Sequence, residues 1–102
     1  MADRTIRVTP EALLKIAGSH DRIADELAAA RRAGEDILAA AATHGPIMHR
    51  FKRAVRDAVA RRDEAFAAQE ARHRTAATAL RQAAARFTEQ EDANAAATKR
   101  LS

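Results

Sequence analysis

Histidines are the side chains of this sequence best suited to acid–base or metal chemistry, because it contains no cysteine. Two of the four, His44 and His49, flank Gly45-Pro46 in the stretch THGPIMH. They could act as metal ligands or as a general base. However, this stretch holds no Cys, Asp or Glu to complete such a site. A residue at a helix end that satisfies backbone carbonyl groups is therefore the favoured interpretation of His44.

The other two histidines, His20 and His73, lie on the apolar rows of two separate predicted helices. If these helices pack antiparallel, the two imidazoles fall within a few residues of each other. A hydrogen-bonded pair is favoured over a metal bridge, because metal sites need further well-placed ligands. No Gly-rich phosphate loop, paired carboxylates in a cleft or supported Ser-His-Asp order is recognisable. The sequence therefore predicts no enzyme, no catalytic or metal-binding residue, no cofactor and no small-molecule substrate.

A basic stretch, His49 to Arg62, could contact phosphate groups, and the whole chain has a net charge of +4 and a pI near 10.6. Such a patch alone gives salt-sensitive, nonspecific binding. Acidic residues interrupt or border it, at Asp57, Asp63 and Glu64, and aromatic side chains for base stacking are lacking. A solvated helix face is favoured and nucleic-acid binding is not expected. Binding to nucleic acid or an anionic surface stays open as the alternative function.

The elements that position these residues are predicted to be two helices in a single domain, residues 1–102. Strong helix formers run from Thr9 to the end, interrupted by Gly45-Pro46. Thr9-Pro10-Glu11 has the residue types of a helix N-terminus. We expect a first helix over about 9–43, a turn at 43–46 and a second helix over about 47–100. The turn residues are Thr43, His44, Gly45 and Pro46. Strands are not expected, because β-branched and aromatic residues are sparse and never alternate.

Apolar residues recur at heptad spacing along both predicted helices, which indicates a helix interface on one face of each. The large apolar residues predicted at this interface are Leu13, Ile16, Ile23, Leu27, Ile37, Phe51, Val55, Val59, Phe66, Leu80 and Phe87. Gly34 falls on the first row, which predicts a close backbone approach there.

A short connection makes the two helices an antiparallel hairpin. At ~1.5 Å per residue the first helix is roughly 50 Å long and the second roughly 75 Å, so the second overhangs beyond about Leu80. Residues 9–42 carry a net charge of −2 and residues 47–102 a net charge of +5, which favours their pairing. The predicted fold is all-α: an antiparallel helical hairpin with a long overhanging second helix.

An alanine-rich seam between two helices buries too little surface to offset the entropy of ordering the chain. We therefore expect a homodimer or a heterodimer with a similar helical hairpin, forming a four-helix bundle. No apolar run approaches the length of a membrane span. The N-terminal sequence MADRTIRV does not have the features of a cleavable signal peptide.

Three stretches, taken together, resemble the EspC-like family of type VII (ESX) secretion targets, relatives of the WXG-type helical hairpins. The first is VTPEALLKIAGSHD, at residues 8–21. The second is Thr43 to Pro46 with Phe51 five residues on, in the place of Trp-X-Gly in the wider superfamily. The third is LRQAAARFTEQED, at residues 80–92. The resemblance spans almost the whole chain.

This resemblance implies an exported, non-enzymatic actinobacterial protein that is made in the cytoplasm. It would reach the cell envelope or the medium by type VII secretion, after contact with the secretion ATPase. The family's export signal is Tyr-x-x-x-Asp/Glu, just beyond the hairpin. In this sequence Phe87 takes the tyrosine position and Glu91 the acidic one. Residues four apart share a helix face, so the two can be recognised together.

Overall fold

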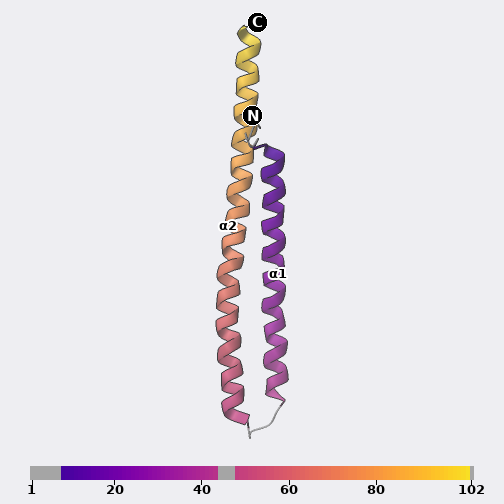
Figure 1. Cartoon of the computed structure of the whole chain (residues 1–102), viewed down its shortest axis with the longest axis vertical. Coiled ribbons are helices and arrows are strands. Elements are labelled where there is room, and N and C mark those ends of the chain that lie inside the picture. Colours follow the sequence, from indigo (N-terminus) through magenta and orange to yellow (C-terminus); the bar gives the residue numbers. More distant parts are fainter. Residues whose placement is uncertain (1–7, 44–47, 102) are drawn as a thin grey trace, which may run out of the picture.

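The protein is an antiparallel helical hairpin in a computed structural model that describes residues 8–43 and 48–101 (Figure 1). Helix α1 spans Pro10–Ala42 and helix α2 spans His49–Leu101. The described residues contain no strand, so the prediction of an all-α hairpin is confirmed. Three of the four predicted turn residues, His44, Gly45 and Pro46, lie outside the described residues.

Helix α1 begins and ends with threonine caps. The Thr9 hydroxyl accepts a hydrogen bond from the Ala12 N–H at 3.1 Å, and Pro10 occupies the first turn, where it needs no N–H partner. At the other end, the Thr43 hydroxyl donates to the Ala40 carbonyl oxygen at 2.7 Å. The Thr9 hydroxyl satisfies an N–H group in the first turn and the Thr43 hydroxyl adds a contact to a carbonyl group in the last turn, so the two caps mark where α1 starts and stops.

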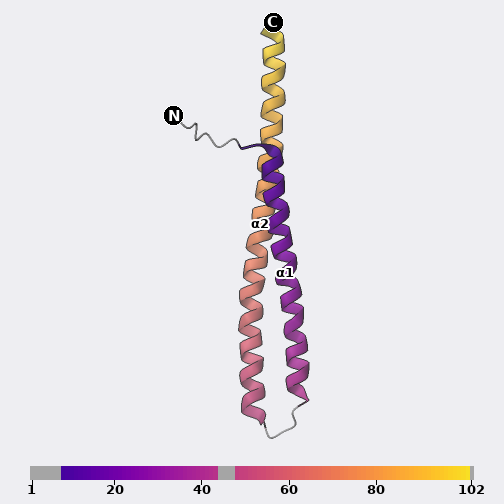
Figure 2. The ribbon, with the colours of Figure 1, turned by 45° about the vertical axis from the view of Figure 1, so that its right-hand side comes forward.

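Helix α2 is 53 residues long and α1 only 33, so α2 extends past its partner (Figures 1 and 2). Pro10 of α1 lies beside Ala84 and Thr88 of α2. We call residues 85–101 the overhang; at 1.5 Å per residue it adds roughly 25 Å to the hairpin. The predicted overhang is therefore confirmed, and it begins about one helical turn later than expected.

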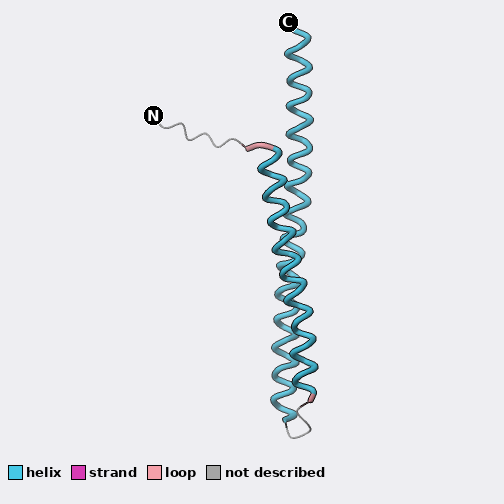
Figure 3. The backbone as a smooth tube through the Cα atoms, turned by 90° about the vertical axis from the view of Figure 1, so that its right-hand side faces the viewer, coloured by secondary structure: helices cyan, strands magenta, loops and turns pink. Residues whose placement is uncertain are grey.

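The side chains buried between the helices are all small in the described part of the chain. Ala17, Ala24, Ala77 and Ala84 are at most 3% exposed, and Gly34 is also buried. Small side chains let two helix backbones approach closely, and the helices stay adjacent over the length of α1 in every view (Figures 1, 2 and 3). The seam therefore runs through Ala17 and Ala24, each one position after an isoleucine.

The large apolar residues predicted at the helix interface divide into two groups. Six are half-buried within the hairpin: Leu13, Leu27, Val55, Val59, Phe66 and Leu80. Five are exposed: Ile16, Ile23, Ile37, Phe51 and Phe87. The hairpin alone does not cover the second group, so its place in a helix interface stays a prediction that depends on a second molecule.

Candidate functional site

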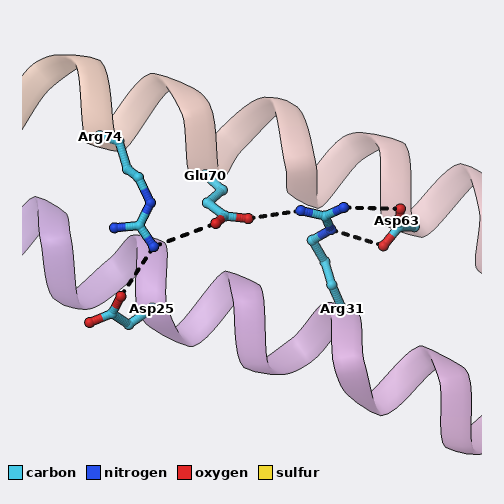
Figure 4. A network of polar contacts seen from close by, with 5 residues as sticks. All are labelled: Asp25, Arg31, Asp63, Glu70 and Arg74. Atoms are coloured by element: carbon cyan, nitrogen blue, oxygen red, sulfur yellow. Dashed lines mark hydrogen bonds and ion pairs between the residues drawn. The ribbon is translucent and has the colours of Figure 1, made fainter.

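A ladder of alternating charges crosses the hairpin between α1 and α2 (Figure 4). Arg31 of α1 donates from Nε to Asp63 Oδ1 at 2.9 Å and from Nη1 to Glu70 Oε2 at 3.0 Å. On α2, Arg74 contacts Glu70 Oε1 at 3.4 Å and crosses to Asp25 Oδ1 of α1 at 3.1 Å. We call these five residues the charge ladder. Their contacts stabilise one antiparallel register, because a shift of either helix along its axis would separate several of these ion pairs at once.

The charge ladder also perturbs the acidity of its members. Hydrogen bonds to Asp63 and Glu70 raise the pKa of Arg31. The hydrogen bond from Arg31 in turn lowers the pKa of Asp63. The sequence analysis did not identify these pairs, although the opposite net charges of the two helices were a general signal of them.

The two histidines on the predicted apolar rows meet across the seam. His20 Nδ1 lies 2.8 Å from His73 Nδ1, and the ring centroids are 5.0 Å apart at an angle of 34°. Both side chains are half-buried. The prediction that they come together is confirmed, and the contact is a direct imidazole–imidazole hydrogen bond. His49 lies apart from them at the start of α2 and is exposed.

Gly34 provides space for an arginine from the opposite helix. A Cβ atom at Gly34 would lie 3.2 Å from both Arg62 Nη1 and Val59 Cγ1. Arg62 extends past this position and donates to the Ala30 carbonyl oxygen at 3.0 Å, with its guanidinium 4.8 Å from the Phe66 ring centroid. The close approach predicted at Gly34 is confirmed. The position of Arg62, which the sequence analysis noted only as the end of a basic stretch, explains why that approach is needed.

Phe87 and Glu91, the candidate recognition residues, both lie on the overhang. Phe87 is 38% exposed, and Glu91 is also exposed. They are four residues apart on a continuous helix, so their side chains emerge from the same face. Because α1 begins opposite Ala84, a large molecule can approach this face without separating the paired helices.

A row of isoleucines forms a second exposed surface, on one flank of α1. Ile16, Ile23 and Ile37 follow heptad spacing and are 39–47% exposed. Asp21, which pairs with Arg81 of α2, lies roughly 140° around the helix from Ile16, at 100° per residue. The Asp21–Arg81 pair therefore lies on another side of α1 from the isoleucine row.

The basic stretch at the start of α2 divides between paired and solvent-exposed side chains. Arg62 is engaged with Ala30 and Phe66, as described above. Arg50, Arg53 and Arg56 are exposed and three residues apart, so successive side chains turn by roughly 60° around the helix.

Residues 8–43 and 48–101 lack two other kinds of feature. These residues hold no group of three or more His, Cys, Asp or Glu placed to bind a metal ion. Neither α1 nor α2 is long and apolar enough to cross a membrane.

Comparisons with known proteins identify one family. The family model described as "Excreted virulence factor EspC, type VII ESX diderm" matches residues 1–100. No curated protein and no solved structure matches the chain.

Proposed function

Because the chain belongs to the EspC family of excreted type VII ESX proteins, we propose a non-enzymatic export substrate that works through helical association. The family match covers almost the whole chain and implies secretion through a type VII system. The overhang is the observation that supports a specific export signal within this proposal. It presents an aromatic and an acidic side chain on one helix face, outside the paired part of the hairpin.

The export signal in this proposal consists of Phe87 and Glu91. A signal read by the secretion ATPase has to stay accessible while the helices are paired. Phe87 and Glu91 meet this requirement because they lie beyond the start of α1. Phe87 supplies a large apolar surface and Glu91 a carboxylate, which an apolar pocket with an adjacent basic group can bind together. Phenylalanine here lacks the hydroxyl group of the family's tyrosine, so recognition rests on the ring and the carboxylate.

The association surface in this proposal is the exposed isoleucine row of α1. Ile16, Ile23 and Ile37 present separate apolar side chains at heptad spacing, which is the pattern of a helix seam. The hairpin buries only alanines and a glycine completely among its described residues, so its own core is small. Covering the isoleucines with a similar hairpin, from a second copy or another chain, supplies the missing burial and forms a four-helix bundle.

An export assay in a host with the cognate secretion system tests the signal. Phe87→Ala and Glu91→Ala should abolish export, because loss of an anchor residue from a small recognition site typically costs a few kcal/mol of binding free energy. Phe87→Tyr should keep or improve export. Helicity should not change, since neither side chain is buried in the seam of the hairpin.

Two matched controls lie on the same helix. Phe51→Ala removes another exposed phenylalanine, near the other end of α2, and Glu89→Ala removes an exposed acid that lies between the two motif residues but is neither of them. Both should be exported at the wild-type level. If Phe87→Ala and Glu91→Ala also reach the medium at that level without any partner, the assignment of the signal is wrong. Export that stops only when a co-expressed partner is deleted shows that the chain travels with that partner.

A further inference from the structure

We propose that the hydrogen bond between His20 and His73 is an acid-sensitive clasp. It holds the overhang end of the hairpin closed only while one Nδ1 atom donates and the other accepts. This inference concerns the stability of the seam and is independent of the export signal. The two Nδ1 atoms are 2.8 Å apart, which is a hydrogen-bonding distance. One Nδ1–H donates and the other Nδ1 accepts through its lone pair.

The chemistry of imidazole sets the limit on protons at this contact. A neutral pair satisfies the contact with one donor tautomer and one acceptor tautomer, and a singly protonated pair does so with the cation as donor. Both nitrogens of a protonated imidazole carry a hydrogen, so a doubly protonated pair has two donors and no acceptor. It also places two positive charges at one half-buried position. The second proton therefore breaks the contact.

The charged groups around the clasp offer no free carboxylate to offset a second imidazolium. On α1 the nearest acids along the chain are Asp21, which pairs with Arg81, and Asp25, which pairs with Arg74. On α2 the nearest acid is Glu70, which contacts Arg31 and Arg74. The fully buried residues around the clasp are alanines, at 17, 24 and 77. Nothing in this set replaces the lost acceptor.

The location of the clasp determines what opens with it. His20 lies between Ala17 and Ala24, and His73 lies one turn before Ala77, so the imidazoles are in the most closely packed part of the seam. Alanines contribute little contact area each, so separation of the imidazoles loosens this end. The free part of α2 then extends from the overhang back toward His73, and half-buried Leu80 becomes available to another helix.

The direction of the pH effect follows from proton counting. In an unfolded chain both imidazoles take up a proton as the pH falls through about 6.5. The closed clasp takes up at most one, so the unfolded state binds more protons below that pH and the folded state is destabilised. Stability from the clasp is thus present at pH 7.5 and is lost with increasing acidity.

Urea unfolding of the full chain, followed by circular dichroism at 222 nm at one protein concentration, tests the clasp. One excluded proton raises the unfolding equilibrium constant by about tenfold between pH 7.5 and pH 5.5. His73→Gln should remove this change, because the contact between two imidazoles is then gone. His49→Gln is the matched control: this histidine is exposed at the start of α2, so its variant should keep the wild-type pH dependence.

Nitrogen NMR of the folded chain gives a readout that needs no variant. At pH 7.5 the clasp predicts a scalar coupling between the two Nδ1 nuclei across one hydrogen bond. At pH 5.5 this coupling should disappear together with the loss of stability. Two protonated imidazoles in a hairpin of unchanged stability at pH 5.5 would overturn the proposal. A wild-type pH dependence that persists in His73→Gln would overturn it as well.

Discussion

The two ends of the paired hairpin are held together in different ways. In the half nearest the overhang, alanines fill the seam, and Ala17, Ala24, Ala77 and Ala84 are almost completely buried. In the half nearest the turn, Gly34 is the only buried residue among those described. Arginines cross the seam there, and a shallow groove of about 470 Å³ lined by Ala28, Leu38, Val59 and Ala60, among others, stays open.

The difference shows how side-chain size sets the kind of contact that holds two helices together. Alanine brings the backbones close enough for the seam to exclude solvent, but each contact is small. Arginine spans a wider gap through hydrogen bonds and leaves uncovered space beside it. Arg31 and Arg62 do this in the turn half, with contacts to Asp63, Glu70 and the Ala30 carbonyl group. Both halves have polar contacts across the seam, including His20–His73 in the overhang half, but only the overhang half also has a buried row of alanines.

The largest expected effect comes from enlarging one alanine in each half. Ala77→Leu adds three carbon atoms at a position only 1% exposed, so the helices have to move apart. Overpacking of this kind destabilises by about 1–3 kcal/mol. Ala60→Leu adds the same three carbon atoms in the groove of the turn half, where space exists. This variant should leave the free energy of unfolding unchanged or raise it. Urea unfolding at neutral pH measures both; equal losses would contradict the contrast between the halves.

A second comparison uses the two glycines inside α1. A Cβ at Gly18 meets nothing within 4 Å, so Gly18→Ala should stabilise by about 0.5–1 kcal/mol through helix propensity. At Gly34 the new Cβ lies 3.2 Å from Val59 Cγ1 and Arg62 Nη1. Gly34→Ala should therefore gain less or lose stability, because Arg62 and Val59 have to shift by a few tenths of an ångström to admit the Cβ. Thermal unfolding of the two variants side by side measures the difference, and equal stabilisation would show that the approach at Gly34 is not tight.

The smallest effect concerns the charge ladder. The pKa of Asp63 is lowered by its hydrogen bond from Arg31, so its contribution to stability is present above the unfolded pKa of about 3.9. That contribution is lost as the pH falls through the lower folded pKa. Wild-type protein should lose more stability than Asp63→Asn between pH 5 and pH 2, and added salt should reduce the difference.

Glu64→Gln provides the control for this comparison, because Glu64 is an exposed carboxylate adjacent to Asp63 and outside the charge ladder. Its acid profile should match that of the wild-type protein. An identical profile in Asp63→Asn would mean that the Arg31 contact contributes nothing measurable in solution.

The main features of the hairpin were accessible from local chemistry in the sequence. Thr9-Pro10 marks the start of α1 because a hydroxyl cap and a proline both suit a helix N-terminus. Heptad spacing placed His20 and His73 on facing rows, and their contact follows from antiparallel pairing. The overhang follows from the unequal lengths of two uninterrupted helical stretches. Phe87 and Glu91 were found by resemblance to a family, and their role in export stays a prediction.

The tertiary structure alone decided which stripe of each helix is buried. In α1 the sequence offers two neighbouring rows one residue apart, one with Ile16 and Ile23 and the other with Ala17 and Ala24. The hairpin buries the alanines and exposes the isoleucines, because the short distance between the backbones admits only small side chains. Arg62 lies across Gly34 for a related reason: a missing Cβ matters only when the other helix is close enough to use the space. The spacing of apolar residues does not reveal the distance between the two helix backbones, since that distance arises from the packing of both helices together.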